Sequence, residues 1–251
     1  MHDDFPSKNT PDSPTPSPLA RESTIQRIPY GLAAERQALL VECRRRGESS
    51  DLVWYLEHPP IVTWNPGRGV QHLRVSEEEL ARQGVELAKT NRGGDVTFHG
   101  PGQLIGYPIV DLSDSSPGAA VGCDLHAYLR ALEEALIAAL AEYGVESGRI
   151  RGLTGVWVGE EKVAAIGVRA SRWIVSHGFS LNVRGALAPF RDLIVPCGVS
   201  DRGVTSLERL LGSQVPTNEQ LVTSIHRRLE AALGRSLALT FDSFEVIESS
   251  F

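Results

Sequence analysis

Apolar residues recur every three or four positions in three long segments of the chain, and this spacing predicts amphipathic helices. Each segment ends just before a glycine, which commonly terminates a helix because it adopts left-handed backbone angles at little cost. An aspartate and a threonine start the second and third segments, where they can accept N–H groups of the first turn. The predicted helices cover 32–46, 124–143 and 217–233, and a shorter helix with a Ser76–Glu79 capping box covers 76–82.

Shorter runs rich in β-branched and aromatic residues predict strands between these helices. The strands are expected at 52–56, 61–64, 104–112 and, as a set, within 155–183. Strands and helices do not alternate strictly, so the pattern predicts an α+β fold, with a mixed sheet and packed helices. Residues 1–24 are rich in Pro, Ser, Thr and Asp, and we expect a disordered tail there, followed by one catalytic domain over 25–251.

The composition narrows the class of protein. The 251 residues carry a net charge of −6, which argues against a nucleic-acid partner. No apolar run approaches the roughly 20 residues that cross a bilayer, and the N-terminus lacks the features of a secretory signal. The three cysteines, Cys43, Cys123 and Cys197, are widely spaced, which argues against a disulfide framework and a cysteine-rich zinc site. We therefore expect a cytoplasmic protein with no membrane partner.

Glycine and polar side chains are concentrated in the segment 92–103, RGGDVTFHGPGQ. Its glycines allow a sharp turn and a close backbone approach to a ligand. Arg92, Thr97, His99 and Gln103 supply hydrogen-bonding groups. A structural turn is the alternative, but this concentration between apolar strands favours a ligand loop. No GxxxxGKS/T motif occurs in the chain and no helix plainly follows the segment, so it is not predicted to be a P-loop or a dinucleotide fingerprint.

Two residues suggest covalent chemistry. Cys197 follows a proline and precedes a glycine in a polar segment, a poor place for core packing, and Lys162 precedes an apolar run. A neighbouring ammonium or base can generate the reactive thiolate, so this pair would suit acyl transfer through a thioester. A buried cysteine and a solvated lysine are the alternatives, as is a protease-like arrangement of Cys197 with His177 and Asn182. The chain has no HExxH motif, so His99 and His177 are not expected to bind a metal.

Several stretches together make the chain resemble the lipoyl(octanoyl) transferases, also called lipoate-protein ligase B. The resemblance spans about residues 26 to 210. One stretch, VTWNPGR over 62–68, departs from the compact Thr-Leu-Gly-Arg usual in that family. The matching stretches are LEHPP at 56–60, RGGDVTFHGPGQ at 92–103 with Tyr107 and Pro108, KVAAIG at 162–167, HG at 177–178 with Asn182, and PCG at 196–198 with the segment through 205–207.

The resemblance implies an α+β fold like that of biotin protein ligases and lipoate ligases. It also implies octanoyl transfer from an acyl carrier protein to a lysine of lipoyl domains, such as those of 2-oxoacid dehydrogenases and the glycine cleavage H protein, with no cofactor. By the same resemblance, Cys197 carries the acyl group and Lys162 lowers its pKa. The implied substrate-binding residues are Arg92, Gly93, Gly94, Asp95, Val96, Thr97, Phe98, His99, Ala165, Ile166, Gly167, Gly178, Phe179 and Ser180.

Two other functions remain open at this level. One is an ATP-dependent ligase of lipoate or biotin, which would need ATP and would not depend on Cys197. The other is a non-catalytic module that binds lipoyl domains or acyl carriers. An acidic acyl carrier would need a local basic patch on this acidic chain. The candidates for that patch are Arg44, Arg45, Arg46, Arg149, Arg151, Arg169 and Arg172.

Overall fold

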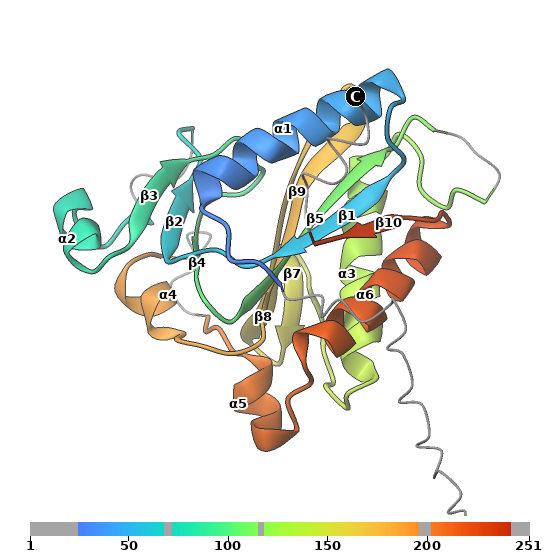
Figure 1. The fold of residues 1–251 in the computed structure, drawn as a ribbon. Coiled ribbons are helices and arrows are strands. Elements are labelled where there is room, and N and C mark those ends of the chain that lie inside the picture. Colours follow the sequence, from blue (N-terminus) through green and yellow to red (C-terminus); the bar gives the residue numbers. More distant parts are fainter. Residues whose placement is uncertain (1–24, 68–71, 115–117, 196–201, 242–251) are drawn as a thin grey trace, which may run out of the picture.

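The computed structural model describes residues 25–67, 72–114, 118–195 and 202–241 (Figure 1). The predicted tail at 1–24 and Cys197 lie outside these residues. A mixed seven-stranded sheet forms the centre of the fold. In spatial order its strands are β10 (Ala238–Thr240), β1 (Leu52–Leu56), β5 (Gln103–Asp111), β9 (Ile174–Asn182), β8 (Glu161–Ser171), β7 (Leu153–Val158) and β6 (Gly148–Ile150).

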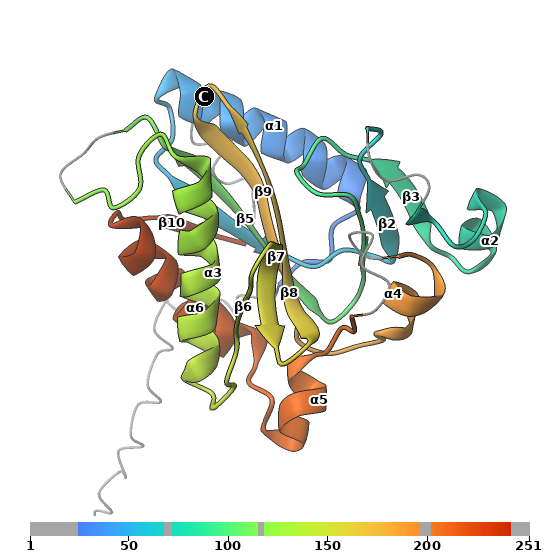
Figure 2. The same cartoon turned by 180° about the vertical axis from the view of Figure 1, so that it is seen from behind.

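Helices cover both faces of this sheet (Figures 1 and 2). Helix α1 (Tyr30–Arg46) packs on one face, and α3 (Leu125–Ala141) with α6 (Asn218–Leu233) packs on the other. The side chains of strand β1 pack into the cores on both faces of the sheet. Because side chains alternate along a strand, Trp54 joins the cluster under α1, whereas its neighbours Val53 and Tyr55 join the cluster under α3 and α6. The α+β prediction is confirmed.

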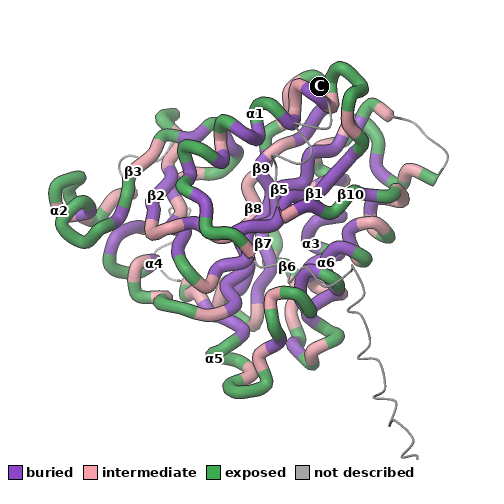
Figure 3. Tube along the Cα trace, in the orientation of Figure 1, coloured by how far each residue is buried: buried purple, intermediate pink, exposed green. Residues whose placement is uncertain are grey.

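A smaller three-stranded sheet lies beside the central one. Its strands, in order, are β3 (Glu86–Lys89), β2 (Ile61–Trp64) and β4 (Val96–His99). It shares a separate core with α2 (Glu77–Arg82) and α4 (Ala188–Asp192). Figure 3 shows buried positions continuing from the central strands into this second sheet. The remaining short elements are α5 (Leu207–Leu211) and the 3₁₀ turn η3 (Gly212–Gln214).

The predicted helices all form, and their caps follow the expected chemistry with one exception. The Asp124 carboxylate accepts two N–H groups of the first turn of α3. The complete capping box is at Thr217 and Gln220 of α6, not at the predicted site. At α2 the Ser76 hydroxyl does accept the Glu79 N–H, but the Glu79 carboxylate bonds to side chains later in the helix. Only half of that predicted box is therefore present.

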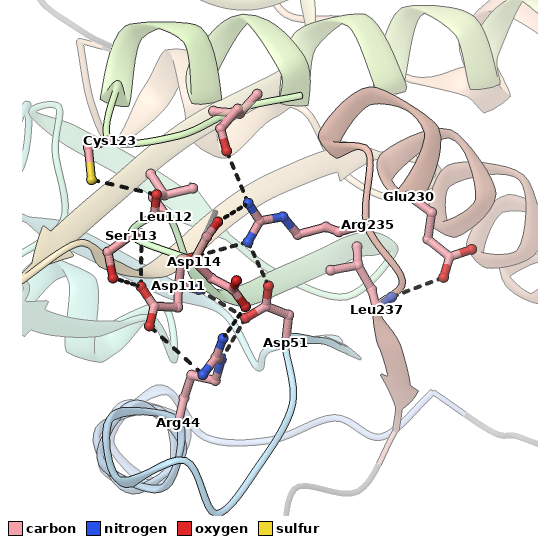
Figure 4. A network of polar contacts seen from close by, with 11 residues as sticks. Arg44, Asp51, Asp111, Leu112, Ser113, Asp114, Cys123, Glu230, Arg235 and Leu237 are labelled. Atoms are coloured by element: carbon pink, nitrogen blue, oxygen red, sulfur yellow. Dashed lines mark hydrogen bonds and ion pairs between the residues drawn. The ribbon is translucent and has the colours of Figure 1, made fainter. Parts of the chain in front are cut away.

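A buried ion network joins the C-terminal part of the fold to the central sheet (Figure 4). The Asp51 carboxylate, 7% exposed, accepts from Arg44 Nε at 2.7 Å and from Arg235 Nη1 at 2.9 Å. It also accepts the backbone N–H of Asp111 at 2.9 Å. Arg235 follows α6 directly and also donates to the carbonyl of Val121. These bonds connect the end of α6 to β1, β5 and the loop before α3.

We expect Asp51→Ala to lower the free energy of unfolding by about 3–5 kcal/mol, because two arginines whose side chains are only 14% and 6% exposed lose their shared carboxylate. Urea denaturation followed by circular dichroism measures this change. The matched control is Glu57→Ala in the pair with Arg27, whose side chain is 53% exposed, and we expect a cost below about 1 kcal/mol there. Equal costs for the two variants would contradict the structural role of the network.

Candidate functional site

A cavity of about 410 Å³ lies against β5, β8 and β9, with the glycine-rich segment on one side. Its size falls within the range of small-molecule sites. Leu125 and Leu129 from α3 contribute apolar walls, and Lys162 contributes a cation. The predicted binding residues that line it are Arg92, Gly93, Gly94, Asp95, Val96, Thr97, His99, Ala165, Ile166, Gly167, Gly178, Phe179 and Ser180.

Phe98 is the predicted binding residue that lies elsewhere. The sequence analysis treated 92–103 as a loop, but its middle forms strand β4. Alternation along β4 directs Phe98 into the core of the smaller sheet, where its ring packs on Phe190 with centroids 5.7 Å apart. Thr97 and His99 line the cavity instead. The segment does line the cavity, and Phe98 differs because it belongs to a strand that was expected to be a loop.

Two glycines allow the loop to approach β8 closely. The Gly93 N–H donates to the carbonyl of Val168 at 2.8 Å. A Cβ on Gly93 would lie 2.9 Å from that carbonyl oxygen, and a Cβ on Gly167 would lie 2.8 Å from the Gly93 oxygen. Both distances are too short for a carbon atom against fixed backbone. Glycine at both positions therefore allows the loop to lie directly against the strand.

The buried Arg92 side chain fixes the base of the loop. Its Nη2 donates to the backbone and side-chain oxygens of Thr63 in β2, each at 3.0 Å, and its Nη1 donates to the Gly93 carbonyl at 3.0 Å. The backbone oxygen of Arg92 accepts from Asn65 Nδ2 at 3.0 Å. Asn65 belongs to the stretch that departs from the family pattern. That departure therefore contacts the glycine-rich loop directly.

Lys162 lies near the start of β8, and its partly buried side chain lines the cavity. Its ammonium nitrogen lies 4.7 Å from the centroid of the Trp157 ring, a favourable cation–π position. Its backbone N–H donates to the Gly203 carbonyl and its carbonyl accepts from the Thr205 N–H, both at 3.0 Å. These two bonds hold residues 203–205 beside Lys162. Gly203 follows Cys197 by six positions in the sequence. Cys197 itself lies outside the described residues.

Two neighbouring buried histidines, His58 and His99, are held neutral, and His99 lines the cavity. His58 Nδ1 lies 2.6 Å from the Ile28 carbonyl and so carries the proton, which leaves Nε2 to accept from the Tyr107 hydroxyl at 2.7 Å. His99 Nδ1 donates to Gln103 Oε1 at 3.1 Å. Burial lowers the pKa of His58 to about 4 and that of His99 to about 3. Neither side chain carries charge at neutral pH.

His177 has an unusual backbone. Its φ of +57° is in the left-handed region that rarely suits a residue with a side chain, and it lies within β9. The pairing of β9 with β5 is interrupted here, between the Gly106–Phe179 and Val110–Val175 pairs, and this stretch of β5 contains Pro108, which has no N–H to give. Its own N–H donates to Gln37 Oε1 of α1 at 2.9 Å, and its ring Nε2 donates to Asn91 Oδ1 at 2.9 Å. Sequence reasoning noted the histidine but missed this conformation.

Burial, together with the charges of Arg92 and Arg169, lowers the pKa of His177 to about 4. The protease-like alternative is not supported by the geometry. His177 bonds to Asn91, whereas Asn182 Nδ2 donates to the Thr205 carbonyl at 3.0 Å. The two side chains thus have separate partners.

The three lowered pKa values predict that the protein loses stability in mild acid. The unfolded chain takes up a proton on each histidine near pH 6.5, whereas native His58 and His177 do so near pH 4 and His99 near pH 3. At pH values between the native and unfolded pKa of a histidine, the unfolded chain therefore binds a proton that the native chain does not. The stability that each neutral histidine contributes to the free energy of unfolding is fully present above pH 6.5. It is lost as the pH falls, by up to about 1.4 kcal/mol per pH unit for each histidine.

Urea unfolding at pH 7 and pH 5.5 measures this effect. We expect His177→Gln to reduce the difference between the two pH values, and the exposed His126→Gln to leave it unchanged. An unchanged difference in the His177 variant would show that this histidine titrates alike in both states.

Most arginines of the predicted basic patch are occupied by ion pairs. Arg44 pairs with Asp51 and Arg149 with Glu133 and Glu134. Arg45 and Arg46 pair with glutamates on or just after α1. The seven arginines therefore do not form a single patch of unneutralised charge. Within the described ranges, no group of three or more His, Cys, Asp and Glu is arranged to hold a metal, and no helix has the length and apolar character needed to span a bilayer.

Comparison with known structures places the fold. Lipoate-protein ligase A bound with ATP superimposes with a TM-score of 0.65 at 14% identity, over 85% of this chain and 87% of that chain. A bi-partite lipoate protein ligase from Thermoplasma acidophilum gives a TM-score of 0.63 at 16% identity, over 85% and 86% of the two chains. At these identities the comparison shows the fold alone, and it confirms the expected likeness to lipoate ligases.

Sequence comparison shows the family. Residues 29–230 match the lipoyl protein ligase A/B catalytic domain. An octanoyltransferase from Solibacter usitatus is 50% identical over 186 residues, which cover 74% of this chain and 81% of that protein. An octanoyltransferase from Acidobacterium capsulatum is 46% identical over 221 residues, which cover 85% and 89%. The chain therefore belongs to the lipoyl protein ligase A/B catalytic domain family, together with these octanoyltransferases.

Proposed function

We propose that this protein transfers an octanoyl group from octanoyl-acyl carrier protein to a lysine of lipoyl domains, through a thioester on Cys197. The observation that carries the proposal is the position of Lys162, the partner that the resemblance implies. It lines the same cavity as the glycine-rich loop, and its backbone is paired with the segment that follows Cys197. The family membership, with relatives named octanoyltransferase, supports the same reaction.

The first half of the reaction exchanges one thioester for another. The Cys197 thiolate attacks the acyl carbonyl, and the carrier thiolate leaves. A thiol has an ordinary pKa of about 8.5, so little thiolate is present at neutral pH without a nearby cation. The Lys162 ammonium supplies that charge and then protonates the leaving carrier thiolate, so that the Lys162 amine is neutral when the second half begins. Exchange between thioesters is nearly balanced in energy, so this half needs no ATP.

In the second half, the acceptor amine attacks the enzyme thioester and an amide forms as the Cys197 thiolate leaves. The incoming lysine must lose a proton, and in its neutral form Lys162 would act as the base that accepts it. The narrow, mostly apolar cavity accommodates the chain, with Leu125, Leu129 and Ile166 among its walls.

The donor requirement tests this function. We expect transfer to a lipoyl domain with octanoyl-acyl carrier protein alone, without ATP. Octanoate with ATP should give no product. Product from octanoate only when ATP is present would instead identify a ligase, and tight carrier binding with no transfer from either donor would identify a binding module.

A further inference from the structure

A second cavity, of about 550 Å³, lies under α1 beside the site described above. Its walls come from α1, from the end of β3 and the residues after it, and from the β8–β9 ladder. Tyr30 and His177 line both cavities. The two spaces are therefore neighbours that share a boundary. The mechanism above makes no use of the second one.

The charge of this second cavity is of one sign. Arg45, Lys89 and Arg169 line it, and none of its lining residues among those the structure describes is an aspartate or a glutamate. Arg45 pairs with Glu42 along α1. Lys89 lies over the Trp64 ring at 5.8 Å, and Arg169 is exposed. Three cations in one cavity are notable in a chain of net charge −6.

The inner wall adds polar groups and short apolar side chains. Gln37, 3% exposed, uses its Oε1 to accept the His177 N–H, and its Nε2 has no hydrogen-bond partner among the described residues. Ala34, Ala38 and Val41 of α1 complete the wall. A cavity with cationic residues and a mixed polar and apolar inner wall suits an extended small-molecule chain that bears an anionic group. A folded protein surface is too broad to enter it.

We propose that this second cavity binds the phosphate of the arm on which the acyl donor carries its thioester. The inference rests on the proposed function, because a carrier protein presents its acyl group on an amide-containing arm that is attached through a phosphate. Lys89 and Arg169 would bind the phosphate through charge-assisted hydrogen bonds. The arm would then pass Tyr30 and His177, which line both cavities, and place the thioester in the first one.

Calorimetric titration of the full chain with 4′-phosphopantetheine and with pantetheine tests this subsite without any acyl transfer. The two probes differ only in the phosphate. We expect the phosphorylated probe to bind at least about tenfold more tightly. In the double variant Lys89→Gln/Arg169→Gln this preference should fall to within about twofold. Equal affinity of the two probes for the native chain, or no measurable binding of either, would overturn the proposal.

A matched control removes the same charge elsewhere. Arg82 and Arg172 are exposed and do not line the cavity, so Arg82→Gln/Arg172→Gln should keep the tenfold preference. Loss of the preference in both double variants would point to net charge rather than to a site. A chain that transfers octanoyl groups but binds both probes equally lacks this subsite and keeps the proposed function. A chain that prefers the phosphorylated probe but transfers nothing keeps the subsite and loses the function.

Discussion

We expect Lys162→Ala to slow octanoyl transfer by about 10²–10⁴-fold, the range seen when a positioned proton-transfer group is lost. The side chain lies in the cavity over Trp157, where it can affect both the thiolate and the incoming amine. The rate is measured as octanoyl-lipoyl domain formed per unit time at saturating donor. Near-normal turnover would reject the role of Lys162.

Two further variants separate charge from proton transfer. Lys162→Arg keeps a cation but cannot give up its proton at neutral pH. We expect it to preserve rapid alkylation of the reactive thiol at pH 7 and to remain slow in transfer to the amine. Lys8→Ala, in the segment outside the family resemblance, should leave both rates unchanged. Slow alkylation in the arginine variant would show that charge alone does not sustain the thiolate.

We expect Cys197→Ser to lower turnover by at least about a thousandfold, because a serine hydroxyl is not ionised at neutral pH and the acyl-enzyme cannot form at a useful rate. The other two cysteines provide controls. Cys43 lies on the buried face of α1, and Cys123 is exposed just before α3. Cys43→Ala and Cys123→Ser should each retain turnover within a few-fold of the native rate. Activity that survives loss of Cys197 would reject the thioester route.

Periodicity predicted the long elements well, because burial of one face dictates the residue spacing. The helices capped by Asp124 and Thr217 begin where their caps indicated. The strand β10 was missed because three residues, two of them exposed, carry no readable alternation. It forms only through parallel pairing with β1, a contact between residues far apart in the chain. Short elements of this kind depend on tertiary contacts rather than on local sequence.

The candidate site was predictable in its residues but not in its geometry. The motifs around Arg92, Ala165 and Gly178 line a single cavity, which no local rule could establish. The left-handed His177 donates its N–H to the Gln37 side chain, where the pairing of β9 with the Pro108 stretch of β5 is interrupted. Those three residues are distant in sequence, so their relation appears only when β5, β9 and α1 meet.

Intact-mass analysis of the protein after brief mixing with octanoyl-acyl carrier protein tests the central claim most directly. The account predicts an increase equal to one octanoyl group, mapped by peptide analysis to Cys197 and absent from Cys197→Ser. Addition of a lipoyl domain should remove the adduct and transfer the group to a lysine of that domain. Octanoylation of the lipoyl domain with no adduct at any time on Cys197 would contradict the account.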